Sequence, residues 1–414
     1  MWKIHGKFYD LENFLNRHPG GRTILESSKN GIDCTASFES YHAMCDKNLI
    51  NSIMKKYEVD CTENEPEQLF MFKEQDFYDI LTKRVKRYFL FNNLSHHYNS
   101  FWIKKALIQV SLYLVSFLLF CYCKGIGLIL RMILAFFSGH MFIQYGFSVM
   151  HEASHCAISP DHKHNEALSK TWNSLALWDH QLWNKHHCYR HHSFTGTKYD
   201  PDTLHFLPIV RKSLHENANK YFKNIGCTKT LVLFFTCVFP GLWFGQVLAY
   251  CNWIYRKRLW RVSLGTYHFS LVETLLKLFT VMSLMYSSDL RIIFSFMLAC
   301  NITYFMCIIP NHDSFETHAN ITTDMKNTDW GEFQVRNSGN FATDNYLVNY
   351  CFGGINYQIE HHLFPTICHV HFPQIQEIVK KTCEEFDIPY VENKNIYLAI
   401  SSVLKNFDLI SKQP

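Results

Sequence analysis

The sequence predicts a multidomain protein, in which a small α+β domain precedes an all-α integral membrane domain with a histidine-rich cap. The chain has 414 residues, which is too long for one small core. Short strand-like and helical stretches fill its first 60 residues, and four long apolar runs follow in two close pairs. We therefore expect a first domain at 1–62, a linker with an amphipathic helix at 63–100, and a membrane domain at 101–414.

Composition excludes several classes of protein. The formal net charge is only +4, and the one marked basic cluster, at 256–261, suits a membrane surface, so we expect no nucleic-acid partner. The 15 cysteines are odd in number and lack framework spacing, which indicates reduced thiols instead of a secreted disulfide scaffold. The opening residues, MWKIHGKFYD, contain no apolar core, so membrane insertion must use internal segments.

The N-terminal domain contains two histidines in distinctive settings. His18 begins HPGG, which taken alone is compatible with an ordinary turn, and His42 ends DCTASFESYH. Together with the strand-like KFYD and the closing MKKYEV, residues 2–60 resemble cytochrome b5. The resemblance implies haem b with His18 and His42 as axial ligands, an arrangement that leaves no open position for oxygen and favours electron transfer. The stretch departs from the family at its start, where the usual first helix and strand are missing.

The next segments connect this domain to the membrane. A polar, acidic linker at 60–68 is followed by apolar residues at near-helical spacing over 76–91, which predicts an amphipathic helix.

Four apolar runs, at 106–123, 132–150, 269–287 and 291–309, predict four transmembrane helices in two hairpins. A fifth run, 231–251, is interrupted by Pro240 and two glycines. We expect it to lie in the membrane interface, because a spanning helix there would separate histidine motifs that must act together. The haem domain and these motifs would then all be cytosolic, as the positive-inside tendency favours.

Two histidine motifs follow the first predicted hairpin, and a third follows the second. Ten of the 24 histidines lie between positions 151 and 205. HEASH places His151 and His155 four apart, on one helical face, where both can bind one metal ion. HHCYRHH repeats this spacing with His187 and His191, and His192 adds a third donor. A later stretch, YQIEHHLFP, adds two adjacent imidazoles, those of His361 and His362.

Seven clustered imidazoles exceed the needs of one zinc site, so two metal ions are the simpler interpretation. Imidazole suits several first-row metals and does not select iron by itself. A fused haem domain does favour iron, because single electrons are useful to a redox metal that activates oxygen and useless to zinc.

The order of motifs resembles the front-end fatty acyl desaturases over nearly the whole chain. The resemblance rests on VMHEASH, WNKHHCYRHHSFTGTKYDPD, DWGEFQVRNSGNF and YQIEHHLFP, together with the two hairpins and the cytochrome b5-like domain. It implies four membrane helices under a cytosolic cap with a di-iron centre, and O2 as co-substrate. It also implies NADH-derived electrons from a separate NADH–cytochrome b5 reductase, a fatty acyl-CoA or acyl-lipid substrate, and a multi-pass location among the lipids of the endoplasmic reticulum membrane.

The resemblance assigns further roles. Gln358 stands where many other membrane desaturases have a histidine, which is typical of enzymes that insert a cis double bond between an existing one and the carboxyl end. The imidazoles of His361 and His362 would reach different irons. Glu360 would either accept a hydrogen bond from a ligand imidazole or be a solvated surface carboxylate. Asp200 and Asp202 are candidates for the same supporting role, with a turn-forming role slightly favoured. The remaining histidines here, expected at the surface or outside the ligand set, are His162, His164, His180, His186 and His205.

An eighth ligand is needed if two irons take about four protein ligands each. His312 follows the fourth apolar run in IIPNHDSFETH, and the broad family likewise places a ligand histidine after the fourth helix. We therefore expect His312, in preference to His318, to complete the set; an interfacial histidine at the helix end is the alternative.

Three other functions stay open at this point. A sphingolipid long-chain-base desaturase has the same domain order, and a fatty acyl hydroxylase could use the same iron centre. A non-catalytic haem carrier is the third, although the intact histidine motifs argue against it.

Overall fold

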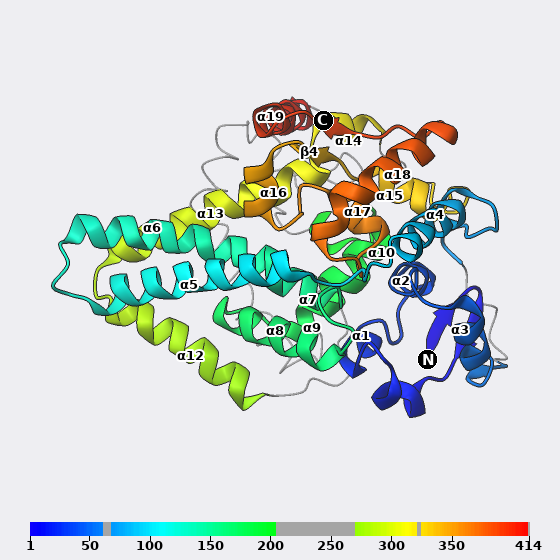
Figure 1. Ribbon diagram of the computed structural model, residues 1–414, viewed down its shortest axis with the longest axis horizontal. Coiled ribbons are helices and arrows are strands. Elements are labelled where there is room, and N and C mark those ends of the chain that lie inside the picture. The colour runs from blue at the N-terminus through cyan, green and yellow to red at the C-terminus, as the bar shows by residue number, and fades with distance from the viewer. Residues whose placement is uncertain (61–67, 204–269, 321–323, 413–414) are drawn as a thin grey trace.

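The computed structural model describes residues 1–60, 68–203, 270–320 and 324–412 of the chain. In these residues a small N-terminal domain packs against one end of a long helical body (Figure 1). The segment 231–251, the basic cluster at 256–261 and His205 lie outside the described residues.

The N-terminal domain is built on a three-stranded antiparallel sheet, β1 (Trp2–Ile4), β2 (Lys7–Tyr9) and β3 (Glu58–Val59), in that order. The first strand lies within the opening WKIHGKFYD, where Trp2 and Ile4 alternate with Lys3 and bury their side chains in the core. Four short helices complete the domain: η1 (Glu12–Arg17), α1 (Arg22–Ser27), α2 (Thr35–Tyr41) and α3 (Lys47–Met54).

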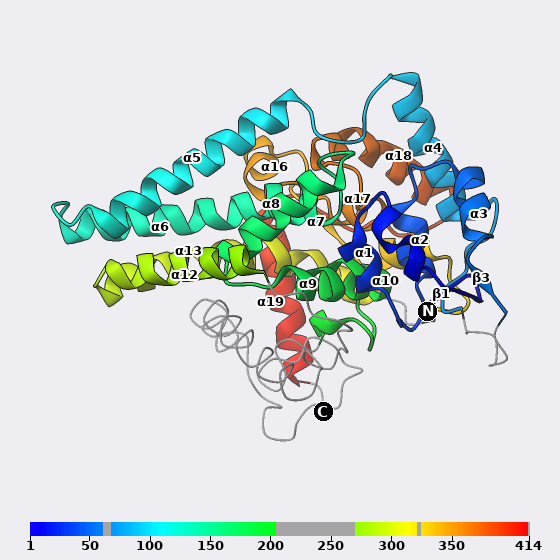
Figure 2. The same ribbon diagram turned by 90° about the horizontal axis from the view of Figure 1, so that it is seen from below.

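The helix predicted over 76–91 is α4 (Phe77–Phe91), and it joins the two parts of the molecule. It starts where the Asp76 side chain accepts a hydrogen bond from the Phe77 amide. Its buried face belongs to one apolar core that also contains Trp2 of the N-terminal domain and Phe364 of the helical body. The small domain is thus packed onto the rest of the chain through a continuous core (Figures 1 and 2).

Three stretches of the described residues are long and apolar enough to cross a membrane: Ser100–Tyr122, Leu128–Ser154 and Leu290–Asn320. The expected fourth span is not among them. Its helix, α12 (Leu271–Tyr286), has 16 residues, because the Ser270 side chain caps the Glu273 amide and the helix begins only at Leu271. Such a helix is about 24 Å long, short of a hydrocarbon core of about 30 Å.

The apolar helices are arranged in two hairpins, each joined by a short turn. Helices α5 (Ser100–Tyr122) and α6 (Leu128–Tyr145) form one hairpin, and α12 forms the other with α13 (Leu290–His312) (Figures 1 and 2). Gly139 of α6 faces α13 so closely that a Cβ there would lie 2.4 Å from the Phe296 carbonyl oxygen. Arg131 ties the two hairpin ends together, since its guanidinium donates to the carbonyls of Phe120 and Ser287, both at 2.9 Å.

The rest of the body covers the opposite ends of these helices with short elements. Before the second hairpin these are η2 (Gly146–His151), α7 (Glu152–Ser154), α8 (His162–Leu175), α9 (His180–Trp183), η3 (Asn184–His191), α10 (His192–Phe194) and η4 (Pro201–Thr203). After it they are α14 (Phe315–Asn320), α15 (Trp330–Arg336), α16 (Tyr346–Phe352), α17 (Gln358–Leu363), η5 (His369–His371), α18 (Phe372–Glu385) and α19 (Ile396–Lys412). Two strands, β4 (Asn340–Phe341) and β5 (Glu392–Asn393), pair in parallel.

Candidate metal centre

The first histidine motif begins at the last residue of one π-helical turn, and most of the second lies on another. Segments η2 and η3 both have this geometry, in which hydrogen bonds join residues five apart and the turn is wider than in an α-helix. His187 and His192, five apart, consequently point into one group of imidazoles, whereas His191 points into another. The expectation that His187 and His191 meet one metal is therefore wrong, because it assumed α-helical spacing.

A glycine turn brings the third motif to the first. Gly353, at the end of α16, has a φ of +61°, a backbone conformation that favours glycine. A Cβ at this position would lie 2.7 Å from the Ser148 amide nitrogen of η2. The turn therefore lies directly against η2, and α17, with its two histidines, follows within a few residues.

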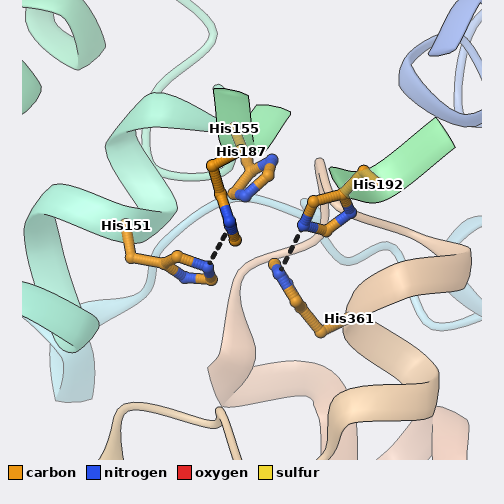
Figure 3. Close-up of side chains that lie close together, drawn as sticks. All are labelled: His151, His155, His187, His192 and His361. Atoms are coloured by element: carbon orange, nitrogen blue, oxygen red, sulfur yellow. Dashed lines mark hydrogen bonds between the residues drawn. The ribbon is translucent and has the colours of Figure 1, made fainter. Parts of the chain in front are cut away.

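Five buried imidazoles form the first group: His151, His155, His187, His192 and His361. Their candidate ligand nitrogens all lie within 4.8 Å of one another (Figure 3). The Nε2 atoms of His151 and His187 are 2.9 Å apart, and those of His192 and His361 are 3.1 Å apart. Burial lowers the pKa of His155, His187, His192 and His361, so these rings are neutral and their lone pairs are available.

Three imidazoles form the second group: His191, His312 and His362. Each turns its Nδ1 atom toward an acceptor: the Asp200 carboxylate at 3.1 Å, the Asn337 carbonyl at 2.9 Å and the Gln334 amide oxygen at 2.9 Å, respectively. With Nδ1–H donating, Nε2 is the unprotonated nitrogen of each ring and the one left to bind a metal ion, which is the usual arrangement around a metal-binding imidazole.

The two groups are neighbours. His192 of the first group stacks on His362 of the second, with ring centres 4.2 Å apart. His361 and His362, adjacent in sequence, fall into different groups, which is the separation that the sequence analysis expects. Nε2 of His155 and Nε2 of His362 are buried without a hydrogen-bond partner in the described part of the chain. Unpartnered buried nitrogens are costly, and bound metal ions would satisfy them, so this donor set fits a pair of ions.

In the N-terminal domain, His18 and His42 face each other with ring centres 6.1 Å apart. Two axial bonds of about 2 Å, with about 1 Å from each nitrogen to its ring centre, would give about 6 Å. The Nδ1 atoms point to the carbonyls of Gly21 and Phe38, at 3.3 and 2.7 Å, which leaves both Nε2 atoms free. Both rings line an apolar cavity of about 310 Å³. Burial lowers the pKa of His18 to about 4, so the ring is a neutral ligand, and the pair fits haem.

Comparison with known proteins gives a family match for each part of the chain. A model of the fatty acid desaturases matches residues 127–394, and one of the cytochrome b5-like haem/steroid-binding domain matches residues 1–60. The chain belongs to the fatty acid desaturase family. This desaturase is 26% identical over 419 residues to an acyl-lipid (8-3)-desaturase of Physcomitrium patens, a match that covers 96% of this chain and 85% of the relative.

Two further relatives have comparable similarity. An acyl-lipid (8-3)-desaturase of Mortierella alpina is 27% identical, over 99% of this chain and 94% of its own. An sn-1 linoleoyl-lipid 6-desaturase of Synechocystis is also 27% identical, over 84% of this chain and 98% of its own.

Other polar residues of this desaturase surround the two histidine groups. Asp200 accepts from His191 and also from the Gly196 amide at 2.8 Å, so it both forms the turn and orients a ring. Asp202 lies 2.7 Å from Nε2 of His186. The Gln358 amide nitrogen lies 2.9 Å from Nε2 of His312, at the edge of the second group.

Glu360 follows neither expected role. Its carboxylate is buried and accepts hydrogen bonds from the Asn340 amide and the Tyr390 hydroxyl, both at 2.7 Å. Burial raises the pKa of Glu360 to about 7. It therefore holds α17 against the chain that carries β4 and β5, instead of orienting an imidazole.

A buried network of charged side chains, not expected from the sequence, lies beside the first group. The Glu152 carboxylate lies 2.8 Å from Nδ1 of His369 and accepts from the Trp102 indole at 3.0 Å. The Lys105 ammonium lies 2.8 Å from Nε2 of the same His369. The position of Glu152 inside HEASH was the available signal. The histidines expected outside the ligand set, His162, His164, His180 and His186, lie in neither group.

Replacing His18 or His42 with alanine should abolish the bis-imidazole visible spectrum of the purified protein, because each variant loses one axial bond. His5→Ala is the matched control, since the His5 ring instead pairs with Glu39 at 2.8 Å. Unchanged spectra in both the His18 and His42 variants would contradict the assignment.

His312→Ala should lower the affinity for non-haem iron by about tenfold or more and stop turnover, while haem binding and membrane insertion persist. His318→Ala is the control, because His318 belongs to neither group in the described residues. Iron would be measured after mild chelation of the purified proteins. Full iron content and turnover in His312→Ala would contradict this role and leave the eighth ligand position to water or Gln358.

Proposed function

We propose that this chain is an oxygen-dependent front-end desaturase that introduces a cis double bond into a (poly)unsaturated fatty acyl chain. One observation carries the proposal: eight imidazoles lie in two adjacent groups beside a domain whose own histidine pair fits haem. The curated relatives are named acyl-lipid desaturases, which supports an acyl substrate.

The donor set determines which chemistry is available. A methylene group has no acidic proton, so a general base cannot start its dehydrogenation, and two irons with O2 would supply the oxidising power. The chain's own residues hold and orient these ions. Asp200, Gln334 and the Asn337 carbonyl would fix three imidazoles with Nε2 inward, so that little reorganisation is needed when iron binds.

Aromatic side chains lie against the first group of imidazoles. The Trp183 ring stacks on His187 at 4.4 Å between ring centres, and Phe147 lies 6.1 Å from His151. We infer that the acyl chain reaches the metal centre along this side, from the lipid. Burial of the acyl chain would contribute roughly 0.8 kcal/mol per methylene to its binding, and the rings of Trp183 and Phe147 would exclude water.

We further infer the membrane arrangement. The turns of both hairpins lie at one end of the body and the N-terminal domain at the other (Figure 1), which supports placing the histidine groups and haem on a single face. That face would be cytosolic on the endoplasmic reticulum, where an NADH–cytochrome b5 reductase can reduce the haem. Helix α12, whose outer side exposes Leu271, Val272 and Met282, would lie in the lipid beside the three spanning helices.

Expression in a host without polyunsaturated lipids tests the function. Cells receive single unsaturated acids, and lipid analysis locates any new double bond. We expect one between the existing double bond and the carboxyl end, with none in a His151→Ala control. A hydroxylated product, or modification only of sphingoid bases, would contradict the proposal.

A further inference from the structure

Tyr41 connects the N-terminal domain to the first histidine group. It is the last residue of α2 and directly precedes His42, one of the two histidines that face each other in the apolar cavity. Its side chain borders that cavity, and its hydroxyl oxygen lies 2.7 Å from Nδ1 of His155. The Tyr41 side chain therefore touches both candidate cofactor sites, although Tyr41 and His155 are 114 positions apart in sequence.

The direction of this hydrogen bond follows from the surroundings. Nε2 of His155 is buried and has no partner in the described residues, so it is the nitrogen available to a metal. The ring proton must then be on Nδ1, from which it is donated to the Tyr41 oxygen. The Tyr41 hydroxyl can in turn donate to the Cys188 carbonyl at 3.4 Å. Tyr41 is thus the acceptor that selects the metal-binding tautomer of His155.

Other contacts between the N-terminal domain and the helical body keep Tyr41 beside His155. The Tyr189 hydroxyl donates to the Asp33 carbonyl at 3.1 Å, and the Thr23 hydroxyl donates to Glu166 at 3.1 Å. A Cβ at Gly31 would lie 2.0 Å from the Tyr189 hydroxyl oxygen, so this approach requires glycine. The position of Tyr41 is therefore determined by a packed interface.

We propose that Tyr41 couples the two sites, as the positioning residue for His155 and as the bonded route for electrons between them. The route runs from His42 through one peptide unit and the Tyr41 side chain, then across one hydrogen bond to His155. The proposal rests on the function proposed above. The N-terminal domain would accordingly complete the metal centre as well as reduce it.

The electron balance is simple. Each transfer oxidises one ferrous haem to ferric and reduces one ferric non-haem ion to ferrous, and Tyr41 and His155 keep their protons. A reductant outside the chain, an NADH-dependent reductase, then restores the ferrous haem.

The test compares the full-length protein with Tyr41→Phe, which keeps the ring and removes the oxygen. Thr23→Val is the matched control, because it removes an interdomain hydrogen bond that involves no histidine of either group. Two quantities are measured: the rate at which a chelator removes non-haem iron, and the rate of oxidation of prereduced haem after mixing with oxygen and acyl substrate, per bound non-haem iron. Visible spectra check that haem is retained.

In Tyr41→Phe we expect iron loss to be faster, or haem oxidation slower, by roughly 10-fold or more, the size typical of losing a ligand's hydrogen-bond partner. Wild-type values in both assays would overturn the proposal, as would equal losses in Thr23→Val, which would indicate a general docking defect. Wild-type protein that binds no non-haem iron would instead refute the proposed function.

Discussion

The orientation of eight imidazoles, seven of them buried, is the constraint on which the rest of the structure depends. Each ring must stay neutral and direct one nitrogen toward the metal position. Its other nitrogen needs a hydrogen-bond partner, because burying it without one is unfavourable. Hydrogen-bond acceptors from separate parts of the chain meet this need: Asp200 near the second motif, Gln334 on α15, the Asn337 carbonyl after it, and Tyr41 from the N-terminal domain. The cap and the small domain are therefore parts of the site.

Helix geometry distributes the rings between the two groups. An α-helical turn would place His187 and His191 on one face, but the wider turn of η3 pairs His187 with His192 and releases His191 toward His312 and His362. A π-helical turn has less favourable hydrogen bonding than an α-helix, and such turns occur often at functional sites. In this chain the π-helical turn of η3 lets one short segment supply histidines to both ligand groups.

Residue type and spacing were sufficient to select seven of the histidines that the structure brings together, and to locate α4 from its apolar period, whereas the selection of His312 also needed the family resemblance. They were insufficient where long-range packing decides. The division of His187 from His191 depends on a π-helical turn, and the burial of Glu360 depends on Asn340 and Tyr390, which are distant in sequence. The apolar run also predicted a longer helix than α12, because the run does not reveal where a serine cap starts the helix.

The central claim is that the two imidazole groups bind a pair of irons next to a one-haem domain. Metal analysis of the purified wild-type chain, with haem measured separately from its visible absorption, tests this most directly. The account predicts one haem and about two non-haem irons per chain, the number that two adjacent groups of five and three imidazoles suggest. Protein that contains haem iron alone, or zinc in place of the non-haem iron, would contradict it.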